Sequence, residues 1–210
     1  LTGIPVETAP SAFSLTNAGS GFARVFPDTL VNSGTGYNYG LEVTLQRYFN
    51  KNWHALFSGC LYNSRYTASD NIERNTSFNG IYALNFLAGR EFEIGVNKVL
   101  GVGLKLTSAG GKRYGIVNDS LSLLQGEVIF QDEGFNESQF QDYFRFDIKT
   151  TFKINQKKIT HEIGVDLVNI TNQSNILSLS YAPDNPNSIN GIVKNNQLGF
   201  LPIFYYRIDF

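Results

Sequence analysis

Residues 143–154 read YFRFDIKTTFKI, and this stretch decides the fold. Hydrophobic and polar side chains alternate along it: Phe144, Phe146, Ile148, Phe152 and Ile154 against Arg145, Asp147, Lys149, Thr151 and Lys153. A period of two is the pattern of a β-strand, because successive side chains point to opposite faces of the sheet. The stretch therefore predicts a strand with one hydrophobic and one charged face.

The same alternation recurs along most of the chain. It is found at residues 37–46, 80–92, 100–107, 162–167 and 200–210. Only residues 53–66 carry bulky side chains at both parities, and there we assign Trp53, Ala55, Phe57 and Leu61 to the hydrophobic face. These segments predict an all-β chain of about eight strands.

The connections between these segments alternate in length. Short turns are expected at 50–52, 96–98 and 155–158, and long polar connections at 69–79, 108–141 and 172–196. This layout indicates an up-and-down antiparallel sheet with one short-turn end and one long-loop end. Residues 1–35, which include Pro5 and Pro27, are interpreted as a strand stub followed by a long loop.

Composition excludes several classes of function. The chain has 17 basic and 18 acidic residues, so it has no electrostatic case for binding nucleic acid. His54 and His161 lie in different predicted strands without ligand-spaced partners, and Cys60 is the single cysteine. We therefore expect no enzyme, no catalytic, metal-binding or cofactor-binding residues and no cofactor.

The absence of Met leads us to expect a processed product or a fragment.

The residues near the short turns distinguish two readings of the hydrophobic face. Aromatic residues (Phe49, Trp53, Phe92 and Phe210) and cations (Arg47, Arg90 and His161) lie there together on the hydrophobic parity. Such a border is typical of the headgroup level of a membrane. We therefore predict a transmembrane β-barrel, in part or whole, with long extracellular loops and short periplasmic turns. A soluble β-domain that buries this face is the alternative.

The barrel interpretation assigns individual residues to each side of the wall. The predicted lipid-facing residues are Leu41, Val43, Leu84, Phe86, Val102, Leu104, Phe146, Ile148 and Val165. The predicted lumen-facing residues are Glu42, Lys105, Arg145, Asp147, Lys149, Lys153, Glu162 and Asp166. For the hairpin around 155–158 we predict a register in which paired positions sum to 315, because it sets Lys153 opposite Glu162 and Lys149 opposite Asp166.

Six stretches together carry a family resemblance. They are GYNYGLE (36–42), RNTSFNG (74–80), GGKRY (110–114), DYFRFDIK (142–149), VNITNQSN (168–175) and FYYRIDF (204–210). In order and spacing they resemble the C-terminal barrel of TonB-dependent outer-membrane receptors. In such barrels the last strand ends on an aromatic residue, and the barrel-assembly machinery recognises this edge. Phe204, Tyr206, Ile208 and Phe210 match that signal.

The resemblance implies a function and a set of partners. Residues 1–210 would be a single segment, the C-terminal part of a barrel in the cell outer membrane, without the plug domain through which TonB acts. The receptor would take up a nutrient, and its partners would be outer-membrane lipid, the assembly machinery and TonB, with a surface lipoprotein as a possible addition. Residues 121–130 of the long connection are a candidate contact for such a partner or for the nutrient. A small barrel with a structural, adhesive or passive-pore role is the alternative.

Overall fold

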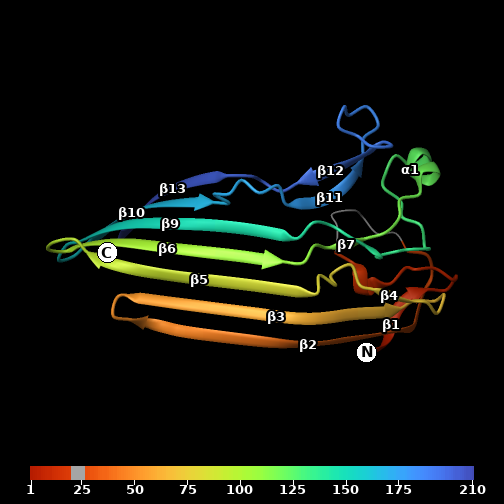
Figure 1. The fold of residues 1–210 in the computed structure, drawn as a ribbon, viewed down its shortest axis with the longest axis horizontal. Coiled ribbons are helices and arrows are strands. Elements are labelled where there is room, and N and C mark those ends of the chain that lie inside the picture. The colour runs from red at the N-terminus through yellow and green to blue at the C-terminus, as the bar shows by residue number, and fades with distance from the viewer. Residues whose placement is uncertain (20–26) are drawn as a thin grey trace.

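One antiparallel sheet dominates the protein. The computed structural model describes residues 1–19 and 27–210, and the described strands run in the order β1-β2-β3-β5-β6-β9-β10-β13 (Figure 1). Their bounds are Thr2–Glu7, Leu30–Asn50, Trp53–Thr67, Tyr82–Glu93, Lys98–Ala109, Tyr143–Asn155, Thr160–Val168 and Leu201–Asp209. A short strand, β4 (Glu73–Asn75), also pairs with β3. The expectation of an all-β, antiparallel chain is confirmed; the main sheet has nine described strands, against the eight or so expected for the whole chain, and further short strands lie outside it.

The pairing register keeps the hydrophobic parity on one face across the whole sheet. Phe57, Phe86, Leu106 and Phe146 are successive partners across β3, β5, β6 and β9. Leu61 pairs with Leu41 of β2. The assignment of Trp53, Ala55, Phe57 and Leu61 to this face is therefore confirmed, because directly paired residues project to the same side of a sheet.

Short turns gather at one end of the sheet and long connections at the other (Figure 1). The β2–β3 turn has Lys51 and Asn52 at φ of 52° and 64°, the left-handed pair that a two-residue type I′ turn requires. The other short turns join β5 to β6 and β9 to β10. The three predicted short turns are thus confirmed.

The sheet is open in the part of the chain that the structure describes. β13 pairs only with β10, and residues 37–50 of β2 pair only with β3. β1, which contains Pro5, lies at the end of the strand order, where a residue without a backbone N–H is tolerated. The sheet therefore presents two strand edges rather than a closed ring.

The first 35 residues are more structured than expected. β1 is the predicted stub, but a 3-10 turn, η1 (Leu15–Asn17), follows it, and β2 already begins at Leu30. The prediction of a loop up to residue 35 is therefore wrong for residues 30–35, and its part at 20–26 lies outside the described residues. β2 begins this early because its first residues pair with β1, and no pattern in the local sequence predicts this pairing.

The long connections contain local structure of their own. Residues 119–125 form a short helix, α1 (Asp119–Gln125), and not an extension of the sheet. β7 (Arg113–Tyr114) pairs with β8 (Ser138–Gln139), and β11 (Ile176–Tyr181) with β12 (Ile192–Asn196), in two separate small sheets. Both described helices fall short of the length and hydrophobicity that a membrane-crossing helix needs.

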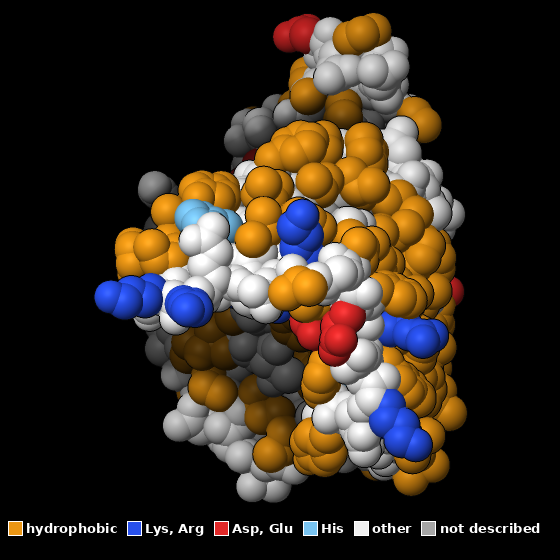
Figure 2. Space-filling view, turned by 90° about the vertical axis from the view of Figure 1, so that its left-hand side faces the viewer, with side chains coloured by type: hydrophobic (Ala, Val, Ile, Leu, Met, Phe, Trp, Pro, Cys, Tyr) orange, Lys and Arg blue, Asp and Glu red, His pale blue; other side chains and the backbone are white. Residues whose placement is uncertain are grey.

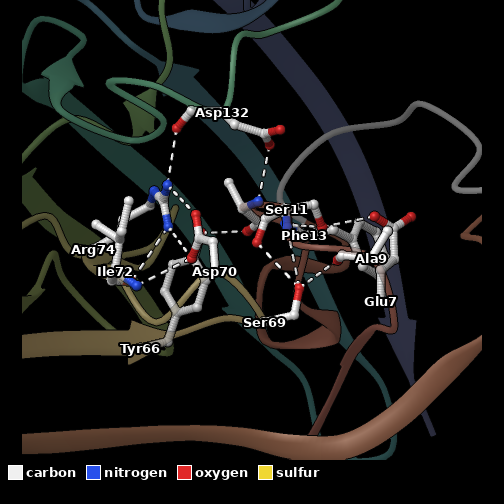
Figure 3. A network of polar contacts seen from close by, with 11 residues as sticks. Glu7, Ala9, Ser11, Phe13, Tyr66, Ser69, Asp70, Ile72, Arg74 and Asp132 are labelled. Atoms are coloured by element: carbon white, nitrogen blue, oxygen red, sulfur yellow. Dashed lines mark hydrogen bonds and ion pairs between the residues drawn. The ribbon is translucent and has the colours of Figure 1, made fainter.

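Polar contacts bind the N-terminal segment to two of the long connections (Figure 3). The Arg74 guanidinium donates to both carboxylate oxygens of Asp70, at 2.9 and 2.6 Å, and to the backbone oxygen of Asp132 at 3.1 Å. The Asp132 carboxylate accepts from the Ala12 N–H at 2.9 Å, and the Tyr66 hydroxyl donates to the Ala12 oxygen at 2.8 Å. Hydrogen bonds therefore hold the N-terminal segment and these two long connections together at the long-loop end of the sheet; we call this network the loop cluster.

Candidate functional site

The hydrophobic face of the sheet is exposed. We call it the outer face and define it by Leu41, Phe86 and Leu104, whose side chains are 68, 39 and 36% exposed. Val43, Leu84 and Val102 are also exposed, whereas Phe146, Ile148 and Val165 are half-buried in the same cross-strand rows. Seen from the short-turn end, hydrophobic side chains cover one flank of the molecule (Figure 2). No second layer of described residues covers this flank.

Burial is inverted relative to a water-soluble domain. Among the described residues only four hydrophobic ones are buried: Val6, Ala12, Tyr66 and Ala68. Ten polar or charged residues are buried, including Arg74 and Glu162. Since hydrophobic burial is the main driving force of folding in water, this distribution leaves the sheet without a core of its own.

Cations lie against aromatic rings where the outer face meets the short turns. The Arg47 guanidinium carbon is 3.9 Å from the centroid of the Trp53 ring, and that of Arg90 is 5.0 Å from the Phe92 ring. Trp53 and Arg90 are direct partners across β3 and β5. Arg47, Trp53, Arg90 and Phe92 thus form one cluster on three neighbouring strands, which we call the arginine–aromatic cluster.

Other aromatic side chains border the outer face at both ends. At the short-turn end His161 stacks on Tyr206, with Nδ1 2.7 Å from the tyrosine hydroxyl. At the long-loop end Tyr37 stacks on Tyr39, and the Tyr82 hydroxyl donates to Asp142 at 2.7 Å. Aromatic side chains with polar contacts therefore lie at both the short-turn and the long-loop end of the outer face.

The opposite face, which we call the inner face, lines a hollow of about 530 Å³. Seven of the predicted lumen-facing residues border this hollow: Lys105, Arg145, Asp147, Lys149, Lys153, Glu162 and Asp166. The eighth, Glu42, lies outside it on β2, where it pairs with Cys60 and is exposed. The charged parity is thus gathered on one concave surface; its description as a lumen stays a prediction.

Ion pairs cross the strands of the inner face. Lys149 lies 3.2 Å from Asp166, and Lys153 lies 3.9 Å from Glu162 and 3.3 Å from Glu91. The predicted register is confirmed, since Lys153 pairs with Glu162 and Lys149 with Asp166. Both signs of charge are interleaved here, so the wall holds its own counter-charges.

Glu162 is the centre of the contacts that hold the last strand. Its side chain is buried, and it accepts from the Tyr205 hydroxyl at 2.7 Å and from Arg207 at 2.8 Å. Both donors lie on β13, which pairs with β10 alone in the described chain. A buried carboxylate with two hydrogen-bonded donors fixes β13 to β10 through its inner face.

The four residues of the predicted assembly signal share the outer side of the C-terminal end. Phe204, Tyr206 and Ile208 pair with Val165, Ile163 and His161 across β10, and Phe210 follows the strand. Their exposed fractions range from 39% for Ile208 to 96% for Phe210. The structure places them on the exposed sheet edge, and their recognition by an assembly machinery stays a prediction.

A second hollow, of about 560 Å³, lies among the long connections. Segments far apart in the sequence line it, including Phe13, Arg113, Tyr114, Phe130 and Tyr181. Burial lowers the pKa of Arg113, whose guanidinium donates to the backbone oxygens of Asn79 and Glu137. No sequence pattern predicts this hollow, because it depends on contacts between loops rather than on periodicity.

Chemistry-bearing side chains are scattered. Within residues 1–19 and 27–210 no group of three or more His, Cys, Asp and Glu side chains is arranged to hold a metal ion. His54 lies on β3 and His161 on β10, and Cys60 is a free, half-buried thiol in β3.

Comparisons with protein-family models, with curated proteins and with solved structures find no match for this chain. The fold and the distribution of side chains on its two faces therefore carry the functional argument.

Proposed function

We propose that this chain forms part of the wall of an outer-membrane β-barrel and belongs to a TonB-dependent receptor that takes up a nutrient. The proposed membrane location is supported by one observation: hydrophobic side chains are exposed and polar ones buried, the reverse of a water-soluble domain. Outer-face residues of β2, β3, β5, β6 and β13 are exposed, among them Leu41, Leu61, Phe86, Leu104 and Phe204, while seven of the eight predicted lumen-facing charged residues line a hollow. Acyl chains would cover the outer face, and water would fill the space beside the inner face.

Size and strand edges favour a wall segment over a small complete barrel. A closed barrel of eight strands leaves an interior only wide enough for side chains. Here the described sheet is open, and β2 and β13 both present unpaired edges. Such edges are paired or covered in stable proteins, and further strands of a larger barrel would pair them.

The receptor part of the proposal rests on the resemblance of the six stretches named above. In that function the chain performs no catalysis. The plug and the long loops would bind the nutrient, and TonB would act on the plug. The present chain would supply part of the barrel wall, some of the long loops and the last strand that the assembly machinery recognises. The hollow among the long connections is the part of this chain most suited to contact a nutrient, because aromatic side chains and an arginine line it.

Cell fractionation tests the proposed location. We expect the complete gene product in the outer-membrane fraction and its release by detergent but not by salt. Recovery in the soluble fraction would contradict the membrane proposal. Copurification with TonB tests the receptor part separately, since a structural or passive-pore barrel would reside in the same membrane without binding TonB.

A further inference from the structure

The arginine–aromatic cluster combines positive charge with an exposed hydrophobic surface. Arg47 and Arg90 are both exposed, and no ion pair to either is found among the described residues. By contrast, Arg65, Arg74, Arg145 and Arg207 each pair with a carboxylate. The two guanidiniums of the cluster therefore lack a counter-charge within the described chain.

The cluster also holds its cations in place. Arg47 lies over the Trp53 ring, and Trp53 is the direct cross-strand partner of Arg90. Stacking on an aromatic face restricts an arginine and leaves the edge of its planar guanidinium, with its N–H donors, free to bind. In the cross-strand row of Arg47 the next two residues are the small Ala55 and Ala88, and the Trp53 ring lies against its guanidinium.

The position of the cluster identifies the occupant. It lies where the hydrophobic outer face ends at the short turns, with Val102 and Leu104 in the same cross-strand rows. A ligand there must present apolar chains to the sheet and an anionic oxygen group to the arginines. A phospholipid with a net negative headgroup has both parts, whereas a free anion has only one.

We propose that Arg47 and Arg90, on either side of Trp53, bind the phosphate of an anionic phospholipid and select it over a zwitterionic one. The site rests on the proposed function, because it requires the outer face to contact a bilayer. It adds to that function a defined lipid contact on β2, β3 and β5. The planar donors of the two arginines match phosphate oxygens, and a choline group would offset part of the attraction.

The single tryptophan of the chain makes the site directly observable. Trp53 is the only Trp among the 210 residues, so intrinsic fluorescence reports on this cluster once any Trp outside residues 1–210 of the complete gene product has been replaced by Phe. This complete gene product is reconstituted into vesicles of phosphatidylcholine and phosphatidylglycerol in which one or the other lipid carries bromine on its acyl chains. The ratio of the two quenching efficiencies gives the relative binding of the two lipids beside Trp53.

The wild-type protein is expected to favour phosphatidylglycerol, with about a fivefold contribution from each arginine. The double variant Arg47→Gln/Arg90→Gln should lose that preference. The control Lys157→Gln/Lys158→Gln removes the same charge from the exposed turn at the same end of the sheet and should keep it. Equal losses in both double variants would mean a general surface attraction and would overturn the site.

Two further outcomes separate the site from the proposed function. Strong quenching by both lipids without preference would leave the membrane contact intact and refute the selective site. Absence of quenching by either lipid would refute the proposed function and the site together. In a last experiment inorganic phosphate is added to the vesicles. We expect the ratio of the two quenching efficiencies to stay unchanged. A loss of the preference for phosphatidylglycerol would show that the cluster binds a free anion instead.

Discussion

The Tyr205 ring on β13 lies against Gly164 on β10, its direct cross-strand partner, and fills the space that a side chain at 164 would need. From there the Tyr205 hydroxyl reaches the Glu162 carboxylate. The glycine, the ring and the carboxylate together set the position of the last strand on the inner face.

Replacing Gly164 by Ala should therefore loosen the last strand. The new methyl group would meet the Tyr205 ring, and overpacking of this kind costs about 1–3 kcal/mol. The matched control is Gly103→Ala, since a Cβ there meets nothing closer than 3.8 Å. Denaturant unfolding in vesicles measures both changes, and equal stability of the two variants would contradict the role given to the tyrosine ring.

Glu162→Gln should destabilise β13 more than Asp209→Asn does. Glu162 is buried and accepts from two β13 side chains, so its loss leaves Arg207 without its closer partner, at a cost of about 1–3 kcal/mol. Asp209 pairs with Arg207 at the exposed strand end, where such pairs contribute about 0–1 kcal/mol. Amide hydrogen exchange of residues 201–209 compares the two variants; similar protection in both would argue against a central role for Glu162.

The tie between Asp70 and Arg74 should weaken in acid. Burial alone would raise the pKa of the Asp70 carboxyl, but hydrogen bonds from Arg74 and from the Ile72 N–H outweigh it and lower the pKa below 3.8. A lowered pKa means that the stabilisation is complete above about pH 3.8 and is lost as the pH falls through the folded-state value. Hydrogen exchange at residues 69–74, which include the Ile72 amide bonded to Asp70, should rise in that range.

Asp70→Asn is the control for this pH dependence. It should raise exchange at residues 69–74 already at neutral pH and remove the part of the change in acid that the Asp70 carboxyl causes, whereas the Asp132 carboxylate that accepts from the Ala12 N–H remains. Unchanged protection of the wild type throughout the acid titration of the Asp70 carboxyl would show that the loop cluster does not depend on this ion pair.

Ile148→Arg should be far more costly than Thr151→Arg. Ile148 lies on the outer face between Leu104 and Leu167, and a cation in the middle of a membrane would cost about 2–4 kcal/mol. Thr151 has the opposite parity and lines the hollow of the inner face, where an arginine can remain hydrated. Unfolding of both variants in vesicles gives the difference, and equal tolerance would mean that the two faces are wrongly assigned.

Much of the sheet could be predicted because each strand carries its own period. The hydrophobic even positions of residues 144–154 identify one face of β9, and the charged residues on the other face then select the β9–β10 register. The observed register places Lys149 opposite Asp166, whereas a shift by two residues would place Asp147 opposite Asp166, a like-charge contact. The faces of β3 were harder, as both carry bulky residues, and only its pairing with β2 and β5 settles them.

The loop end could not be predicted in the same way. Its order depends on contacts between distant segments, such as Arg74 with Asp132, and these leave no periodic trace. Helix α1 was missed although it carries local signals: Asn118 caps its first turn and Gly126 ends it in the left-handed conformation. Leu123 and Leu124 form no buried hydrophobic face on this helix, because both are exposed.

Spin-label accessibility in a bilayer tests most directly whether the outer face contacts lipid. In a complete gene product with Cys60→Ser and any cysteine outside residues 1–210 also replaced, a nitroxide is attached at Leu104→Cys in one sample and at Lys105→Cys in another, so that neighbours in β6 report on opposite faces. We expect the label at 104 to collide with dissolved oxygen and to be shielded from a polar nickel chelate, and the label at 105 to show the reverse. A label at 104 that is open to the chelate, or shielded from both reagents, would contradict the membrane assignment.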